Sequence, residues 1–327
     1  MERREFIKIA CGLVGTWPLA AEAQQSGNQR LIGVLGADAT AWGPWTVALN
    51  ARLRELGWRE GDNLAIEHRW AQGRSDRVSE FAAEFERRKV DAIVTYGSAA
   101  ATLRQTITSI PIVFAVAFDP VRSGLVQSLA HPAGNVTGVS IQQPDLIGKR
   151  LELLRQAIPQ LHRLGILADA GYAEPMLEAD WVKSMAQASG LEAARIEVWR
   201  AEDIAPAFET LRNRADALYV VSFFSDALIA INRTRIVTLA LSARLPTMMS
   251  YDDYVEAGAL MSYGPDYPDL FRRAAEMVDK ILRGTKPGDI PVEQPTKFEF
   301  AINFRTAATL GLTIPQTFLE TVDEILK

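Results

Sequence analysis

RLIGVL at residues 30–35 returns as RLGIL at residues 163–167, and this repeat decides the fold class. Three further segments repeat in the same order along the chain: residues 61–66 and 190–193, DAIV at 91–94 and DALY at 216–219, and IPIV at 110–113 and LPTM at 245–248. Short apolar runs of this kind are typical of buried parallel strands, and apolar residues at helical spacing separate them. Because strands that alternate with helices form βαβ units, the sequence predicts an α/β fold with two doubly wound, Rossmann-like lobes.

Two strand-like segments at the ends of the copies indicate that the lobes are interleaved. VTGVS at 136–140 closes the first copy and ALMS at 259–262 closes the second, after which a helix, a strand and a terminal helix follow. We expect a hinge of several crossovers near residues 141–145 and 263–266, because a few such residues can absorb a rotation of the lobes about a cleft. The predicted lobes are residues 24–142 with 264–327, and residues 143–263.

Residues 1–23 have the features of an export signal rather than of a folded element. Arg3 and Arg4 precede an almost entirely apolar run at 9–20, and AEA at 21–23 is a typical cleavage site. The run is shorter than the ~20 apolar residues of a membrane-spanning helix. The order Arg-Arg-x-Phe-Ile-Lys resembles a twin-arginine (Tat) signal, with the Sec route as the alternative. We therefore expect a mature protein that begins near Gln24 and resides in the bacterial periplasm.

The composition of the 327 residues argues against several classes of function. A formal charge of -5 and the lack of any long Lys/Arg block argue against a nucleic-acid partner. Cys11 lies in the predicted signal, and His68, His131 and His162 are far apart in the sequence, so we expect no metal site. The chain has no Gly-x-Ser-x-Gly, His-Glu-x-x-His or Walker motif, and no Gly-x-Gly-x-x-Gly after a strand. We therefore expect neither an enzyme nor a bound cofactor.

Candidate ligand-binding residues follow the predicted strands, because open α/β sheets bind ligands at the carboxyl ends of their strands. Gly97, Ser98 and Ala99 open a helix after the third strand, where free N–H groups and the helix dipole favour a carboxylate. The alternative for Ser98 is a plain N-cap of that helix. Gly36 and Ala37 follow the first strand and form a similar candidate.

Acidic and aromatic residues at other strand ends complete the candidate site. Asp119, after the fourth strand, and Asp226, at the comparable place in the second lobe, are predicted to bind a ligand ammonium. The alternative for both is a helix cap. Trp42, Phe223 and Tyr251 are predicted to form an aromatic wall over an organic ligand, with core packing as the alternative for each ring.

Three longer segments resemble the ABC transporter substrate-binding proteins of the tryptophan/tyrosine-uptake type: DPVRSGLVQSLA at 119–130, EAGALMSYGPDY at 256–267 and PVEQPTKFE at 291–299. The resemblance covers essentially the whole chain. It implies the fold of a type I periplasmic binding protein and the capture of a small ligand, such as an aromatic or other amino acid. It also implies delivery of this ligand to an ABC permease in the inner membrane. We expect the protein to be a monomer. The chain departs from the commoner family pattern at Ala227 and Asp252, in the ligand wall of the second lobe.

Two hypotheses for function therefore remain open from the sequence. The first is a periplasmic solute-binding component of an ABC importer, and the second is a periplasmic module that reports the same ligand to a chemoreceptor or histidine kinase. An exported α/β hydrolase would need a nucleophile–base pair, which we do not find in the sequence. A DNA-binding regulator would need a helix-turn-helix where the predicted signal stands.

Overall fold

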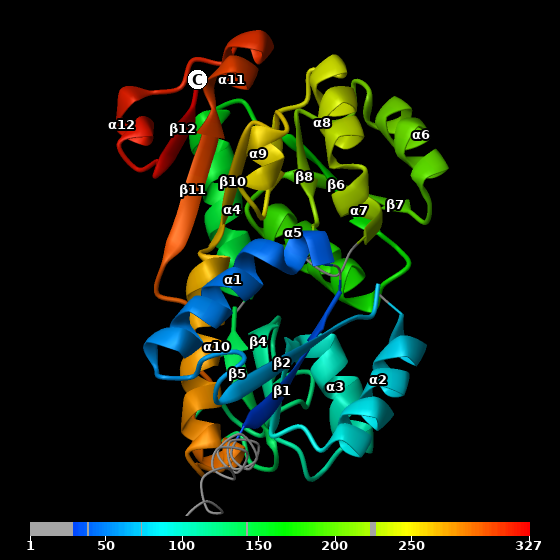
Figure 1. Cartoon of the computed structure of the whole chain (residues 1–327). Coiled ribbons are helices and arrows are strands. Elements are labelled where there is room, and N and C mark those ends of the chain that lie inside the picture. The colour runs from blue at the N-terminus through cyan, green and yellow to red at the C-terminus, as the bar shows by residue number, and fades with distance from the viewer. Residues whose placement is uncertain (1–28, 38, 73, 142, 223–226) are drawn as a thin grey trace, which may run out of the picture.

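The computed structural model describes residues 29–37, 39–72, 74–141, 143–222 and 227–327. Figure 1 shows two lobes, one above the other, each built on its own β-sheet. Both sheets are dominated by parallel strands and carry helices on their faces, which confirms the predicted class of two α/β lobes. The predicted export signal, Phe223 and Asp226 lie outside the described residues.

The first lobe, at the bottom of Figure 1, contains a five-stranded parallel sheet with the order β2-β1-β3-β4-β5. Strands β3, β4 and β5 are buried along their whole length, because α1 and α10 cover one face of the sheet and α2 and α3 cover the other. The elements of this lobe are β1 (Arg30–Gly36), α1 (Ala39–Glu55), β2 (Leu64–Trp70), α2 (Ser75–Arg88), β3 (Ala92–Tyr96), α3 (Gly97–Thr106), β4 (Ile112–Ala117), β5 (Val136–Ser140), α10 (Tyr267–Leu282) and the 3-10 turn η1 (Pro287–Asp289).

The second lobe contains a seven-stranded sheet with the order β12-β11-β10-β9-β8-β6-β7. One apolar core lies between this sheet and helices α4 and α5, and another lies on the opposite face under α6 and α8. The elements are α4 (Gln143–Ala157), β6 (Arg163–Asp169), α5 (Ala173–Ala188), β7 (Glu192–Val198), α6 (Ala201–Leu211), β8 (Ala217–Val220), α7 (Ala227–Ile231), α8 (Arg233–Ser242), β9 (Thr247–Met249), α9 (Asp253–Glu256), β10 (Met261–Pro265), β11 (Phe298–Asn303), α11 (Phe304–Leu310), α12 (Gln316–Leu319) and β12 (Glu324–Leu326).

The chain passes between the lobes three times, after β5, after β10 and before β11. The third passage corrects the prediction that residues 264–327 all belong to the first lobe, which is wrong from β11 onward. β11 pairs antiparallel with β10, and its side chains Phe300 and Ile302 are buried in the core of the second lobe. The sequence repeats indicated only parallel units. The position of an antiparallel strand that follows them depends on its pairing partner, which no repeat identifies.

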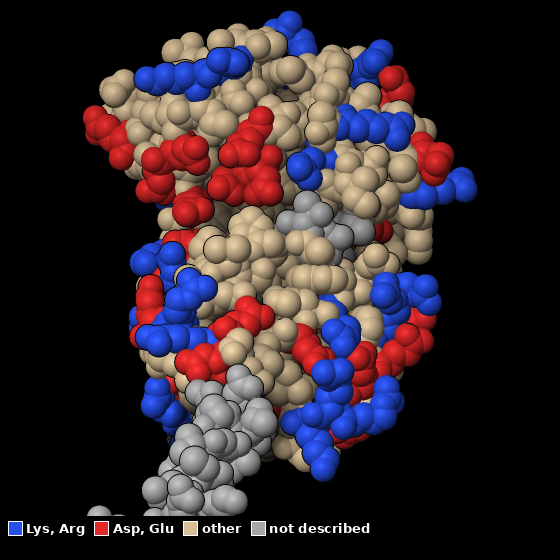
Figure 2. Space-filling view, in the orientation of Figure 1, with Lys and Arg blue, Asp and Glu red and all other residues tan. Residues whose placement is uncertain are grey.

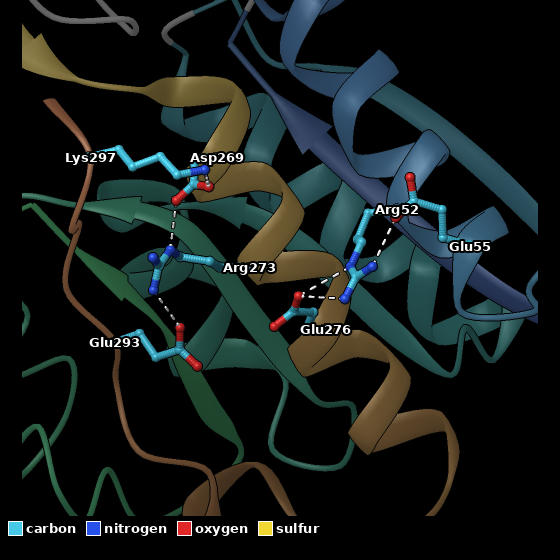
Figure 3. Close-up of polar contacts among 7 residues, drawn as sticks. All are labelled: Arg52, Glu55, Asp269, Arg273, Glu276, Glu293 and Lys297. Atoms are coloured by element: carbon cyan, nitrogen blue, oxygen red, sulfur yellow. Dashed lines mark hydrogen bonds and ion pairs between the residues drawn. The ribbon is translucent and has the colours of Figure 1, made fainter. Parts of the chain in front are cut away.

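Ion pairs along one side of α10 fix this helix to α1 and to the third crossover, as Figure 3 shows. Burial acts to raise the pKa of the Asp269 carboxyl, but hydrogen bonds from Lys297 and Arg273 hold that pKa below its ordinary value. Partly exposed pairs of this kind contribute about 1 kcal/mol or less each, and more when they form a network. The pairs are Arg52 with Glu276 (2.9 Å), Asp269 with Lys297 (2.7 Å) and with Arg273 (2.8 Å), and Arg273 with Glu293 (3.2 Å).

The close packing of α2 on β1 gives a first testable prediction. A Cβ atom at Gly33 would lie 2.7 Å from the ring of Phe85, so Gly33→Ala should lower the free energy of unfolding by about 1–3 kcal/mol through overpacking. Gly148→Ala, inside α4, is the matched control, because the nearest atom to its new methyl group is 3.8 Å away. The free energy of unfolding of this control should rise by about 0.5–1 kcal/mol, because alanine is favoured over glycine inside a helix. Urea denaturation followed by tryptophan fluorescence measures both, and equal midpoints for the two variants would contradict the prediction.

Candidate functional site

A cavity of about 630 Å³ lies between the two lobes. The first lobe contributes the first turn of α3, the loop after β4 and the start of α2, and the second lobe contributes the loop after β6 and the first turn of α5. Both sets of residues stand at the carboxyl ends of parallel strands, where open α/β sheets bind ligands. The volume of the cavity is typical of a small-molecule site, for which about 300–1,000 Å³ is common.

The first turn of α3 brings Gly97, Ser98 and Ala99 to this cavity together. Gly97 begins the helix directly after Tyr96, and a Cβ atom at Gly97 would lie 3.1 Å from the Cα of Ala117. Glycine therefore lets the helix start close against β4. The predicted alternative that Ser98 caps α3 is wrong, because Tyr96 holds the cap position and Ser98 is already inside the first turn. N–H groups in a first turn have no partner within the helix and favour an anion.

The first turn of α5 faces the same cavity from the second lobe. Glu174 in this turn lines the cavity together with Ser98 of the first lobe. Burial raises the pKa of the Glu174 carboxyl, and the hydroxyl of Ser98 acts against that rise. The loop before the helix is held by Asp169, whose Oδ1 accepts a hydrogen bond from the N–H of Gly171 at 2.7 Å. Two helix N-termini from different lobes thus line one cavity.

The sequence carries a signal for this second wall that the predicted site does not include. The segment at residues 163–169 repeats the segment at 30–36, so the residues that follow β6 take the place that Gly36 and Ala37 hold at the end of β1. The predicted candidates of the second lobe stand only at the ends of β8 and β9.

Asp119 also lines the cavity, in the loop after β4. Its Oδ1 accepts a hydrogen bond from the N–H of Arg122 at 2.9 Å. The side chain therefore caps the turn that follows it, as the alternative prediction for Asp119 expected. The other carboxylate oxygen accepts no hydrogen bond from the described residues. The neighbouring Phe118 and Arg122 both contact Trp181 of the second lobe, with the Phe118 ring stacked at 5.0 Å and the Arg122 guanidinium 4.8 Å from the indole centroid. These two contacts hold the lobes against each other.

Gly36, Ala37 and Trp42 do not line this cavity. All three are buried in the first lobe, and the Trp42 ring packs edge-on against Phe271 at 5.1 Å. A Cβ atom at Gly36 would lie 2.4 Å from the ring of Trp70, so the residue is needed for packing. Trp42 is therefore a core residue, which is the alternative that the sequence offered to ligand contact. The sequence placed Gly36 and Ala37 correctly at the end of a strand and Trp42 at the start of a helix. The aromatic side chains Trp70 and Phe271 that pack there come from distant segments.

Tyr251 lies in a different place from the other candidates. Its ring packs on Tyr267 at 4.8 Å, beside the crossover from β10 to α10, and it lines a separate cavity. Burial raises the pKa of the Tyr251 hydroxyl well above its ordinary value, and the neighbouring Tyr267 adds to that rise. Phe223 and Asp226 lie outside the described residues, so their predicted ligand contacts stay predictions.

The described residues hold neither a candidate metal site nor a candidate membrane span. No cluster of three or more His, Cys, Asp or Glu side chains in this part of the chain has an arrangement that could hold a metal ion. None of the described helices combines the length and the apolar character that crossing a membrane requires.

A family model described as ABC transporter substrate binding protein matches residues 47–326 of this chain. The chain is also similar to the tyrosine-binding protein of Clostridioides difficile (strain R20291), with 29% identity over 261 residues, which are 80% of this chain and 74% of that protein.

Solved structures show the same likeness at the level of the fold. The ABC domain from Streptococcus pneumonia in complex with L-Trp is 26% identical, with a TM-score of 0.82 over 91% of this chain and 100% of that chain. A conserved domain protein from Vibrio cholerae is also 26% identical, with a TM-score of 0.82 over 91% of this chain and 99% of that chain.

Proposed function

The chain belongs to the ABC transporter substrate-binding protein family, and on this premise we propose that it captures an aromatic amino acid in the cavity between its lobes. This is a family of solute-binding proteins and not of enzymes, so the cavity is a binding site. The observation that carries the proposal is the pair of helix N-termini, of α3 and α5, that meet at one cavity from opposite lobes. The tyrosine and L-Trp bound by the two relatives support the choice of ligand class.

The proposed contacts follow from the charges of an amino-acid zwitterion. Its carboxylate binds at the first turns of α3 and α5, where N–H groups and both helix dipoles favour negative charge. Its ammonium binds at Asp119, whose second carboxylate oxygen is left open by the turn around it. The apolar side chain packs against the aromatic rings of Tyr96, Phe118 and Tyr172, which line the cavity.

We also propose how the lobes act. The hinge consists of the three crossovers, with residues 29–141 and 266–293 in one body and residues 143–265 and 297–327 in the other. The contacts of Phe118 and Arg122 with Trp181 of the second lobe form when the lobes close. A ligand held by both lobes shifts the population toward this closed form.

The same proposal covers delivery and location. Export of the chain by the twin-arginine route after removal of residues 1–23 would place a monomeric receptor in the periplasm, from which an ABC permease takes the ligand. Loss of uptake of labelled ligand in cells that lack the gene, restored by the wild-type chain, tests delivery. Unchanged uptake would favour the sensory hypothesis.

Thermal unfolding of the purified protein with each of the 20 amino acids tests the ligand class. At 100 times its Kd, a ligand stabilises the folded state by about 2.7 kcal/mol, so tryptophan or tyrosine should raise the Tm by several degrees. The D-enantiomers and the amino-acid amides are the controls, because they misplace or remove the carboxylate. A Tm that no amino acid raises would refute the proposed ligand class.

A further inference from the structure

A second cavity, of about 360 Å³, lies beside the crossover from β10 to α10 and is separate from the cavity between α3 and α5. The first lobe contributes the start of α1 and the start of α10. The second lobe contributes the segment from the end of β9 into α9, strand β10 and one residue of β11. Because its walls come from both lobes, its width depends on the angle between them. We call it the hinge cavity.

One wall of the hinge cavity is aromatic. Trp45 and Tyr267 stack at 4.9 Å between ring centroids, and Tyr251 packs on Tyr267 at 4.8 Å. All three rings line the cavity. The faces of aromatic rings attract cations, with tryptophan as the strongest partner.

The opposite wall is acidic and has no basic residue among the described residues that line it. Asp252, Asp253, Glu256 and Glu299 line the cavity, and Figure 2 shows acidic side chains gathered at this place on the upper lobe, next to the junction with the lower lobe. Such a concentration of like charge is unfavourable unless a cation offsets it.

Burial and neighbouring carboxylates raise the pKa of two of these carboxyls. Burial raises the pKa of Asp252 to about 6, and the adjacent Asp253 adds to the rise. Burial likewise raises the pKa of Glu299 to about 7, with further contributions from the nearby carboxylates of Asp266, Asp252, Glu324 and Asp323.

Ser250 provides an independent sign that the cavity is built to hold a ligand. The residue is 3% exposed and lines the cavity, and its buried hydroxyl has no hydrogen-bond partner among the residues that the structure describes. An unpaired buried hydroxyl costs about 1–3 kcal/mol, a cost that a hydrogen-bonding ligand removes.

We propose that the hinge cavity binds a small organic cation, through a primary ammonium or guanidinium group held between the aromatic wall and the carboxylates. A metal ion is not the expected occupant, because the described residues offer no cluster suited to one. The cation stacks on Trp45 and Tyr267, pairs with Asp252 and Glu299, and donates a hydrogen bond to the hydroxyl of Ser250. Since both lobes touch it, its binding is coupled to the position of the lobes and so to the affinity of the other cavity.

The test is isothermal titration of the full chain with agmatine, putrescine and spermidine, with n-butanol as an uncharged comparison. At least one of the cations should bind, and n-butanol should not. The double variant Asp252→Asn/Glu299→Gln should weaken this binding at least tenfold at pH 8. The matched double variant Asp62→Asn/Glu202→Gln removes one Asp and one Glu charge from exposed sites that form no ion pair, and should bind as the wild type does.

The dependence on pH is a second readout. Because the carboxyls with pKa values of about 6 and 7 must be ionised to pair with a cation, binding should strengthen by about tenfold or more between pH 5 and pH 8. The dependence should vanish in Asp252→Asn/Glu299→Gln, which is expected to fold because it removes repulsion. If none of the three cations binds the wild type, or if the double variant binds them equally well, the proposal is wrong. Asp119→Asn should still bind the cation, because Asp119 does not line the hinge cavity. Cation binding can therefore be tested even if the proposed amino-acid site is wrong.

Discussion

Glu178→Ala is expected to lower the free energy of unfolding by about 3–5 kcal/mol, although Glu178 does not line either cavity. The side chains of Glu178 and Arg150 are 0% and 1% exposed, and their closest oxygen and nitrogen lie 3.3 Å apart in the core of the second lobe. The hydroxyl of Tyr219 bridges the pair, at 2.8 Å from each. Removal of the carboxylate leaves a buried guanidinium without a counter-charge. The midpoint of urea denaturation at pH 7 measures the loss.

Two further variants separate this explanation from a general loss of packing. Glu209→Ala removes a carboxylate of the second lobe that pairs only at the surface, and it should change stability by less than about 0.5 kcal/mol. Arg150→Met/Glu178→Leu removes both charges, and it should be more stable than Glu178→Ala alone, because replacing a buried pair with apolar residues is often neutral. A double variant less stable than the single one would contradict the electrostatic explanation.

Asp119→Asn is expected to raise the Kd for the bound amino acid about 30- to 1,000-fold, which corresponds to about 2–4 kcal/mol. The change removes the charge that we propose to bind the ligand ammonium. The turn itself should remain, because the amide oxygen of asparagine can still accept the hydrogen bond that the N–H of Arg122 donates to Asp119. Isothermal titration with tryptophan and tyrosine measures the change.

The control for this variant is Asp62→Asn. Asp62 lies in an exposed turn just before β2, at the opposite end of the strands from the cavity. Both variants should keep the Tm of the ligand-free protein within about 1–2 °C, so a change in Kd reports on binding and not on folding. A Kd for Asp119→Asn within threefold of the wild-type value would show that this carboxylate does not hold the ammonium.

The site was only partly predictable from its residues. Gly97, Ser98, Ala99 and Asp119 line the cavity as a group, since each stands within a few residues of the end of a strand and parallel strands end at one edge of a sheet. Gly36 and Ala37 have the same relation to β1, yet they are buried in the first lobe, where Trp42 of α1 packs among rings from distant segments. Distance from a strand end is local information, whereas exposure to a cavity depends on every element that packs nearby.

The buried charges of the second lobe were not predictable in the same way. Arg150, Glu178 and Tyr219 come from α4, α5 and β8, and each stands in a helix or strand whose pattern gives no sign of a charge partner. The hinge cavity is a similar case, because α1, α9, α10 and β11 bring its walls together across both lobes.

The sequence by itself determined that the chain repeats a βαβ plan, that its repeats form two lobes, and where the carboxyl ends of most strands stand. These properties depend on hydrophobic periodicity and on turn residues, which act over a few neighbouring positions. Only the tertiary structure decided that β11 and β12 join the second sheet, that α5 faces α3 across a cavity, and which rings and carboxylates meet at the hinge. Those arrangements depend on contacts between residues that lie far apart in the sequence, and packing energy, rather than any local pattern, selects among them.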